Sequence, residues 1–213
     1  NGTNRERLKI NATQAVFNEE GQDLDFRVES NGNANMLFVD AGNDAVVVGH
    51  SASIASAGEA HELQVYDTNF SLISAATFRN GSDGASISLS HSRSGTIGTQ
   101  TILQDGDTMG AINFLGSDGT DMASFGARIH AEVDGTPGSN DMPGRLIFAT
   151  TPDGANGSVE RMRIDSAGAA TFAGNVILSD IKASGSGGVA LQTDEGTKRI
   201  IIEDDGDVVI NET

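Results

Sequence analysis

Aspartates beside glycines are the residues of this sequence whose type and spacing could bind a metal ion. They cluster in QDGDT at residues 104–108, GSDGTD at 116–121 and EDDGD at 203–207. Carboxylate oxygens are the ligands that calcium prefers, although none of the clusters has the full spacing of an EF-hand loop. Asp-Gly pairs are also frequent in hairpin turns, so a plain turn is the competing interpretation. The candidate calcium ligands are Asp105, Asp107, Asp118 and Asp121.

The four histidines do not combine into a metal site. None follows another in the His-x-His spacing with which two imidazoles on one strand face can meet at a metal ion. We therefore expect each imidazole to face solvent or to make a local hydrogen bond. The four are His50, His61, His91 and His130.

Motifs for catalysis are missing from the sequence. Asp and Glu number 30, so close carboxylate pairs occur throughout the chain and do not single out a glycosidase pair. No Gly-x-Ser-x-Gly elbow, His-Glu-x-x-His pair or phosphate loop is present. A sugar-degrading enzyme would be expected to display aromatic platforms, and the chain has one Tyr and no Trp. We expect no enzymatic activity and no cofactor, and keep polysaccharide degradation as the alternative.

The elements that position these residues are short β-strands. Apolar side chains alternate with polar or small ones at Gly110, Ile112 and Phe114, and again from Phe125 to Val133. Successive side chains of a strand point to opposite faces, so a period of two predicts half-buried strands. Glycine, proline, Asp and Asn fill the stretches between them, where they favour turns. The turn stretches are GSDG at 116–119, DGTPGSNDMPG at 134–144 and TPDGANG at 151–157.

The whole chain is expected to consist of four segments, most of them built from similar short strands. Residues 1–50 are predicted to form an N-terminal β segment, and the Ala/Ser-rich residues 51–60 a linker or a short helix. Residues 61–160 are predicted to form a central β domain in which FSLISAATF and GASISLSHS are strands. Residues 161–213 are predicted to form C-terminal β repeats.

A short motif occurs three times along the chain. MLFVDAGNDAVVV at 36–48, RMRIDSAGAATF at 161–172 and RIIIEDDGDVVI at 199–210 each give a strand, an acidic residue, a polar turn and a second strand. A unit this small cannot bury both of its faces, so it needs neighbours in its own chain or in other chains. The equivalent acidic residues are Asp40, Asp165 and Glu203.

The supply of bulky side chains predicts assembly of several copies. Among 213 residues there are nine Phe, one Tyr and no Trp, against 27 Gly. Large side chains supply most burial energy, roughly 1.5–3 kcal/mol each when fully covered. A single chain would have a thin core, and its apolar faces are better covered by copies of itself. A monomeric β-sandwich with an Ala/Val/Ile core is the alternative.

Charge and composition exclude several classes of partner. The formal net charge of −17 argues against nucleic-acid binding, because phosphate contacts need clustered Lys and Arg. No run of about 18 apolar residues is present, so we expect no membrane insertion. The absence of Cys rules out disulfide staples in this chain.

The central sequence also resembles a known family. The blocks DGDTMGAINFLGSDGTD, EVDGTPGSNDMPGRLIFATTPDGA and VERMRIDSAG, together spanning 105–168, are similar to a segment of bacteriophage tail fibres, particularly those of marine phages such as cyanophages. A looser block, FNEEGQDLDFRVESNGNANMLFVDAGNDAVVVG at 17–49, is similar to the same family. The resemblance implies a virion protein of the tail or capsid, extracellular after release, with other virion proteins as partners.

Together these observations predict an all-β, elongated homotrimeric fibre of short strands and hairpins. It would be β-helix-like or β-prism-like, with a small β-sandwich segment as a variant. Its expected function is a structural fibre segment that supports or mediates attachment to a host-surface glycan or protein. The alternatives are a polysaccharide-degrading tailspike and a bacterial surface filament or adhesin with phage-like repeats.

Overall fold

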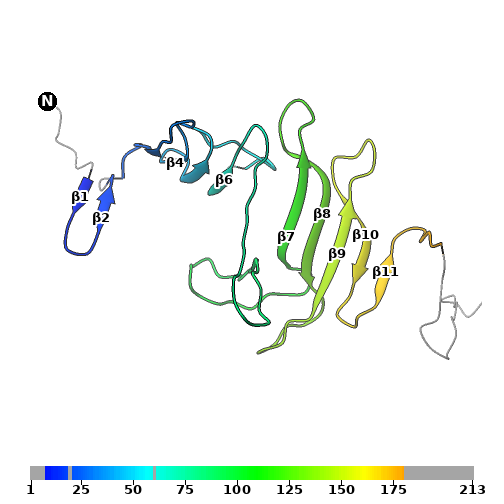
Figure 1. The fold of residues 1–213 in the computed structure, drawn as a ribbon. Helices are drawn as coiled ribbons and strands as arrows, with labels where there is room; N and C mark the ends of the chain where they lie inside the picture. The colour runs from blue at the N-terminus through cyan, green and yellow to red at the C-terminus, as the bar shows by residue number, and fades with distance from the viewer. Residues whose placement is uncertain (1–7, 19–20, 60, 180–213) are drawn as a thin grey trace, which may run out of the picture. The chain divides into compact units, whose positions relative to one another are not determined.

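The computed structural model of the protein describes residues 8–18, 21–59 and 61–179. Within these residues every regular element is a β-strand and no helix occurs (Figure 1). The strands form a two-stranded, a four-stranded and a five-stranded sheet. The predicted all-β class is therefore confirmed. No helix long and apolar enough to span a membrane is found in this described part of the chain.

The five-stranded sheet is an antiparallel meander in the order β11-β10-β9-β8-β7 (Figure 1). Its strands correspond to the alternating runs of the sequence, and the loops between them are the predicted turns. Bulges interrupt the register of β7 with β8 and of β10 with β9. The strands are β7 (Thr108–Gly116), β8 (Ser124–Val133), β9 (Gly144–Thr150), β10 (Val159–Ile164) and β11 (Ala170–Phe172).

The four-stranded sheet has the order β3-β4-β5-β6. Its first three strands pair antiparallel, whereas β6 pairs parallel to β5. A separate hairpin, β1-β2, precedes it in the chain. The strands are β1 (Leu8–Ile10), β2 (Ala15–Phe17), β3 (Phe26–Val28), β4 (Leu37–Asp40), β5 (Ala45–Val48) and β6 (Leu63–Val65).

Two copies of the repeated motif form antiparallel hairpins in which the acidic residue caps the turn. The Asp40 carboxylate ends β4 and accepts hydrogen bonds from the backbone and side-chain amides of Asn43. The Asp165 carboxylate follows β10 and accepts from the backbone N–H of Ala167 and of Ala169. The strand, acid, turn and strand predicted for both copies are thus confirmed. The third copy, with Glu203, lies outside the described residues.

The chain between β6 and β7, residues 66–107, forms no regular element. FSLISAATF and GASISLSHS were predicted as strands, and neither belongs to a sheet. Within the described residues, no backbone hydrogen bond joins residues 70–78 or 84–90 to any other part of the chain. An isolated chain offers these segments no strand beside which to pair, so the local alternation is not sufficient to make a sheet.

The structure describes the chain around two of the expected segment boundaries. The boundary predicted after residue 160 falls inside β10, whose residues pair with β9 on one side and β11 on the other. Residues 51–59 form turns and an isolated bridge between Ser56 and Glu59 in place of the helical alternative.

The hydrophobic core of the described residues is small. Its one packed cluster is formed by Phe38, Ala45 and Val47 of the four-stranded sheet, with Tyr66 against it. Contacts between strands run mainly between hydrogen-bonded neighbours of one sheet. Packing between strands of the described residues is therefore mostly packing within one sheet. The thin core that the composition predicts is confirmed, and its physical reason is the shortage of bulky side chains.

Candidate functional site

Strand register places one apolar side chain from every strand of the five-stranded sheet in a single row. Ile112 lies opposite Ile129, and Ile129 lies opposite Phe148. The row continues through Met162 to Phe172. Directly opposite residues of antiparallel strands share a face. We call the face that carries this row the apolar face.

The apolar face is the more open of the two faces. Ile112 and Phe114 are 55% and 52% exposed, and Phe172 at the other edge is 48% exposed. On the opposite face, Ile147 and Ala149 are each only 5% exposed. An antiparallel sheet in water normally buries its apolar face and solvates the other one. This sheet has the reverse arrangement, which indicates that its apolar face is a contact surface.

One side chain from the irregular segment does cover a corner of the apolar face. Leu89 lies over Gly110, where a Cβ atom would stand 2.5 Å from the Leu89 Cβ. His91 follows, and its Nδ1 lies 2.9 Å from the carbonyl oxygen of Thr108 at the start of β7. Gly110 and Ala131 are opposite each other, so two small residues provide the space for Leu89. Leu89 and His91 thus hold this part of the segment against the first residues of β7.

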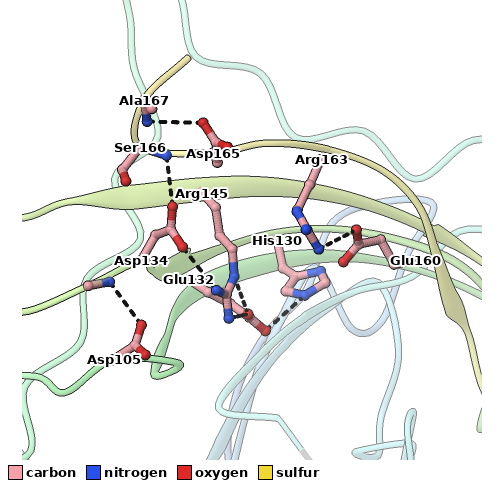
Figure 2. Close-up of polar contacts among 11 residues, drawn as sticks. Asp105, His130, Glu132, Asp134, Arg145, Glu160, Arg163, Asp165, Ser166 and Ala167 are labelled. Atoms are coloured by element: carbon pink, nitrogen blue, oxygen red, sulfur yellow. Dashed lines mark hydrogen bonds and ion pairs between the residues drawn. The ribbon is translucent and has the colours of Figure 1, made fainter. Parts of the chain in front are cut away.

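An ion-pair network occupies the opposite face, which we call the polar face (Figure 2). Arg145 of β9 lies opposite Glu132 of β8 and donates from Nε and Nη2 to Glu132 Oε2 at 3.0 and 2.8 Å. Its Nη1 donates to Asp134 Oδ1 at 3.0 Å. Arg163 pairs with Glu160 at 3.1 Å on β10. Each of these three carboxylates thus accepts at least one hydrogen bond from an arginine.

The same carboxylates fix the loops at one end of the sheet. The second oxygen of Asp134 accepts from the backbone N–H of Ser166 at 2.8 Å, in the turn after β10 (Figure 2). This hydrogen bond, followed by those from the Ser166 side chain and Arg145, lowers the pKa of Asp134. Asp105 accepts from the backbone N–H of Gly135 at 2.9 Å. These hydrogen bonds therefore connect the loop before β7, the loop after β8 and the turn after β10, and their role is structural.

Two polar atoms of β8 on this face lack a partner within the described residues. They are Arg128 Nε and His130 Nδ1, and both are buried. His130 uses its other nitrogen, Nε2, at 3.2 Å from Glu132 Oε1. Buried polar atoms normally have a hydrogen-bond partner. These two mark places on the polar face where an additional polar group would be stabilising.

The predicted calcium ligands are used as hydrogen-bond acceptors for the protein itself. Asp107 forms a two-point ion pair with Arg93 at 2.6 and 2.8 Å, and the hydrogen bonds from Arg93 lower its pKa to about 2. Asp118 accepts from the backbone N–H of Thr120 and of Asp121, which lowers its pKa.

Asp121 in turn caps the backbone N–H of Ala123. No group of three or more His, Cys, Asp or Glu residues that could hold a metal was found among the residues the structure describes. Asp105 and Asp107 thus make separate contacts with Gly135 and Arg93, and Asp118 and Asp121 belong to one turn. EDDGD at 203–207 lies outside the described residues.

The histidines each make a contact of their own, as expected from their spacing. His50 Nδ1 lies 3.0 Å from the carbonyl oxygen of Ala52, and His61 Nε2 lies 3.1 Å from that of Ser56. His91 and His130 contact different strands of the five-stranded sheet, as described above.

The Arg145 network is what sequence reasoning missed. Glu132 belongs to the alternating run of β8, so its face was predictable. Ten residues separate the partner strand β9 from β8, and the register across that long loop has no signal in the sequence. Opposite charges on neighbouring strands were the one available hint, because such pairs are favoured when they lie directly across from one another.

Comparison with known proteins gives matches in structure. No family model and no curated protein matches the sequence. A structure of the carboxy-terminal domain of the bacteriophage T5 L-shaped tail fibre is similar with a TM-score of 0.51 and 13% identity, over 81% of this chain and 68% of that chain. The fold is shared with a phage tail-fibre domain.

A second structure of that tail-fibre domain, which includes its intramolecular chaperone domain, gives the same result. Its TM-score is 0.57 with 14% identity, over 79% of this chain and 50% of that chain. The chain thus spans half the length of this second structure. At such identities the likeness establishes the architecture, which is all-β with antiparallel sheets.

Proposed function

We propose that the protein is a segment of a phage virion fibre, on tail or capsid, that assembles as a homotrimer and supports or mediates attachment to the host. The shared tail-fibre fold carries the proposal. The sequence resemblance over 105–168 supports the same role independently, and the marine association rests on that resemblance alone. Other virion proteins and a host-surface glycan or protein are the expected partners.

Self-association is supported by the exposure of the apolar face. Ile112, Phe114 and Phe172 form a surface that water solvates poorly, and burial of apolar area gives about 25 cal/mol per Å². A chain of net charge −17 also needs a reason for its copies to approach each other, since like charges repel. Burial of the uncharged row from Ile112 to Phe172 would offset this repulsion.

A non-enzymatic role is part of the proposal. A glycosidase requires one carboxylic acid with a raised pKa beside a second carboxylate. On the polar face the pKa of Asp134 is lowered, and Glu132 is bound to an arginine. These contacts favour a structural use of both side chains. Incubation with host capsule or lipopolysaccharide tests this, and released oligosaccharide that disappears in an acidic-pair variant would contradict it.

The oligomeric state is tested by light scattering on the purified chain. We expect a mass three times that of the 22.0 kDa chain. A mass of one chain over a broad range of concentrations would refute the assembly. The virion role is tested by gold-labelled antibodies against the chain on intact particles of the encoding phage, where the label is expected on fibres.

A further inference from the structure

We infer that residues 70–87 of one copy cover the apolar face of the five-stranded sheet of a second copy. This inference rests on the proposed function, because it names the segment and the face through which copies of the fibre chain bind each other. Four observations support it. They are the exposed and unpaired segment, the open apolar face, the path of the chain at Leu89, and the charge of the segment.

The segment has strand-like side chains and no strand partner. Phe78 is fully exposed, and Phe70, Leu72 and Ile87 are 80–81% exposed. The backbone of residues 70–78 and 84–90 makes no backbone hydrogen bond within the described residues. Exposed apolar side chains on an unpaired extended chain form a ready template for association with another chain.

The face offers an apolar surface with room on it. A hollow of about 170 Å³ adjoins Leu89 and is lined by apolar side chains, including Ile112, Ile129 and Leu146. The exposed Phe114 and Phe172 extend the apolar surface beyond the hollow toward the two edges of the sheet. Large aliphatic and aromatic side chains of the segment have the chemistry to fill such a surface.

The path of the chain argues for a second copy over the same copy. Leu89 is seated on its own sheet at Gly110, beside the edge strand β7. Ile87, two residues earlier, is 81% exposed. The segment therefore leaves its own sheet immediately upstream of Leu89, and its apolar side chains are free to reach a neighbouring copy.

Charge is compatible with this same chain as the partner. Between residues 70 and 87 the charged side chains are Arg79 and Asp83, so the segment carries no net charge. The whole chain carries −17. A segment without net charge is not repelled by a copy of that charge, and it meets a face whose central row is uncharged. A foreign partner is the competing occupant, and the experiment below separates the two.

Cysteine cross-linking tests the inference directly, since the chain has no cysteine of its own. Two differently tagged full-length variants, Ile87→Cys and Phe114→Cys, are co-expressed and treated with a short bis-maleimide. We expect a covalent dimer that carries both tags. The matched control replaces Phe114→Cys by Asn113→Cys, the adjacent exposed residue on the polar face, and should give at least several-fold less two-tag product.

The outcomes separate the inference from the proposed function. A single-chain mass in light scattering overturns both. A trimer with no two-tag product, or with equal product from Asn113→Cys, overturns the inference and leaves the fibre role in place. A double variant, Ile87→Cys with Phe114→Cys, that links only within one chain also overturns it.

Hydrogen exchange on the unmodified protein gives a second test that needs no substitution. Residues 70–87 should exchange slowly in the assembled protein, because their amides are covered by the second copy. They should become fast on dilution to the single chain, since among the described residues of this range Gly81 alone donates a backbone hydrogen bond. Fast exchange in the oligomer, or protection that persists at single-chain mass, would contradict the inference.

Discussion

Leu89 lies so close over Gly110 that a Cβ atom at position 110 would stand 2.5 Å from the Leu89 Cβ. This contact joins the irregular segment to the sheet and fixes where the segment leaves it. This close approach is the reason for glycine at position 110. The backbone φ is not the reason, since Gly110 does not have a positive φ. The contact is therefore open to a simple steric test.

We expect Gly110→Ala to destabilise the protein by about 1–3 kcal/mol, since the added methyl group would overlap the Leu89 side chain and must displace it. The measurement is the melting temperature at fixed protein concentration. Gly116→Ala is the control, because Gly116 is also in β7 and a Cβ there meets nothing within 4 Å. Equal melting temperatures for the two variants would contradict the steric account.

Arg145→Met should destabilise the protein by about 1–2 kcal/mol, because Glu132 and Asp134 lose charge-assisted hydrogen bonds while they are only 19% and 22% exposed. Denaturant unfolding measures the change. Arg27→Met removes a pair with Glu29 whose side chains are 51% and 53% exposed, and it should cost less than about 1 kcal/mol. If both variants lose the same stability, the network on the polar face has no special role.

Stability should fall in acid as lowered carboxyl pKa values are titrated. The pKa of Asp107 is about 2 in the folded chain against an ordinary value of 3.8, so the folded state binds fewer protons than the unfolded state between these values. Its contribution is complete above pH 4 and is lost as pH falls toward 2. Asp40, Asp118 and Asp134 also have lowered pKa values and act in the same direction. Melting temperatures from pH 7 to pH 2 check this.

The Asp107→Asn variant isolates one part of that pH dependence. It removes the charge that Arg93 binds, so its melting temperature should be lower than that of the unmodified protein at pH 7 and should converge with it near pH 2. A constant difference across the whole pH range would show that the titration of Asp107 does not contribute.

Asp40→Ala should destabilise the four-stranded sheet by about 1–3 kcal/mol, because Asp40 is 7% exposed and accepts hydrogen bonds from Asn43 and from the backbone N–H of Ser53. Asp153→Ala, at an exposed turn position, is the control and should be nearly neutral. Hydrogen exchange of the amides in β4 and β5 locates the effect. Loss of protection confined to other strands would count against the proposed cap.

The local pattern was a good guide where strands follow one another through short turns. The alternation from Phe125 to Val133 predicted β8, and the acidic residue before a polar turn predicted the hairpins at Asp40 and Asp165. In each case the residues that decide the structure are neighbours in the sequence. The same alternation failed for GASISLSHS, because a strand also needs a partner and the sequence does not say which chain provides it.

By itself the sequence determined the all-β class, the turn positions of the central sheet and the shortage of bulky side chains that leaves a thin core. Side-chain alternation and turn chemistry depend on residues that are neighbours in the sequence, so both can be recognised from the sequence. Only the tertiary structure decided the register that brings Arg145 to Glu132, the row from Ile112 to Phe172, and the exposure of that row. Such pairings depend on backbone hydrogen bonds between strands separated by loops, and no local signal fixes them.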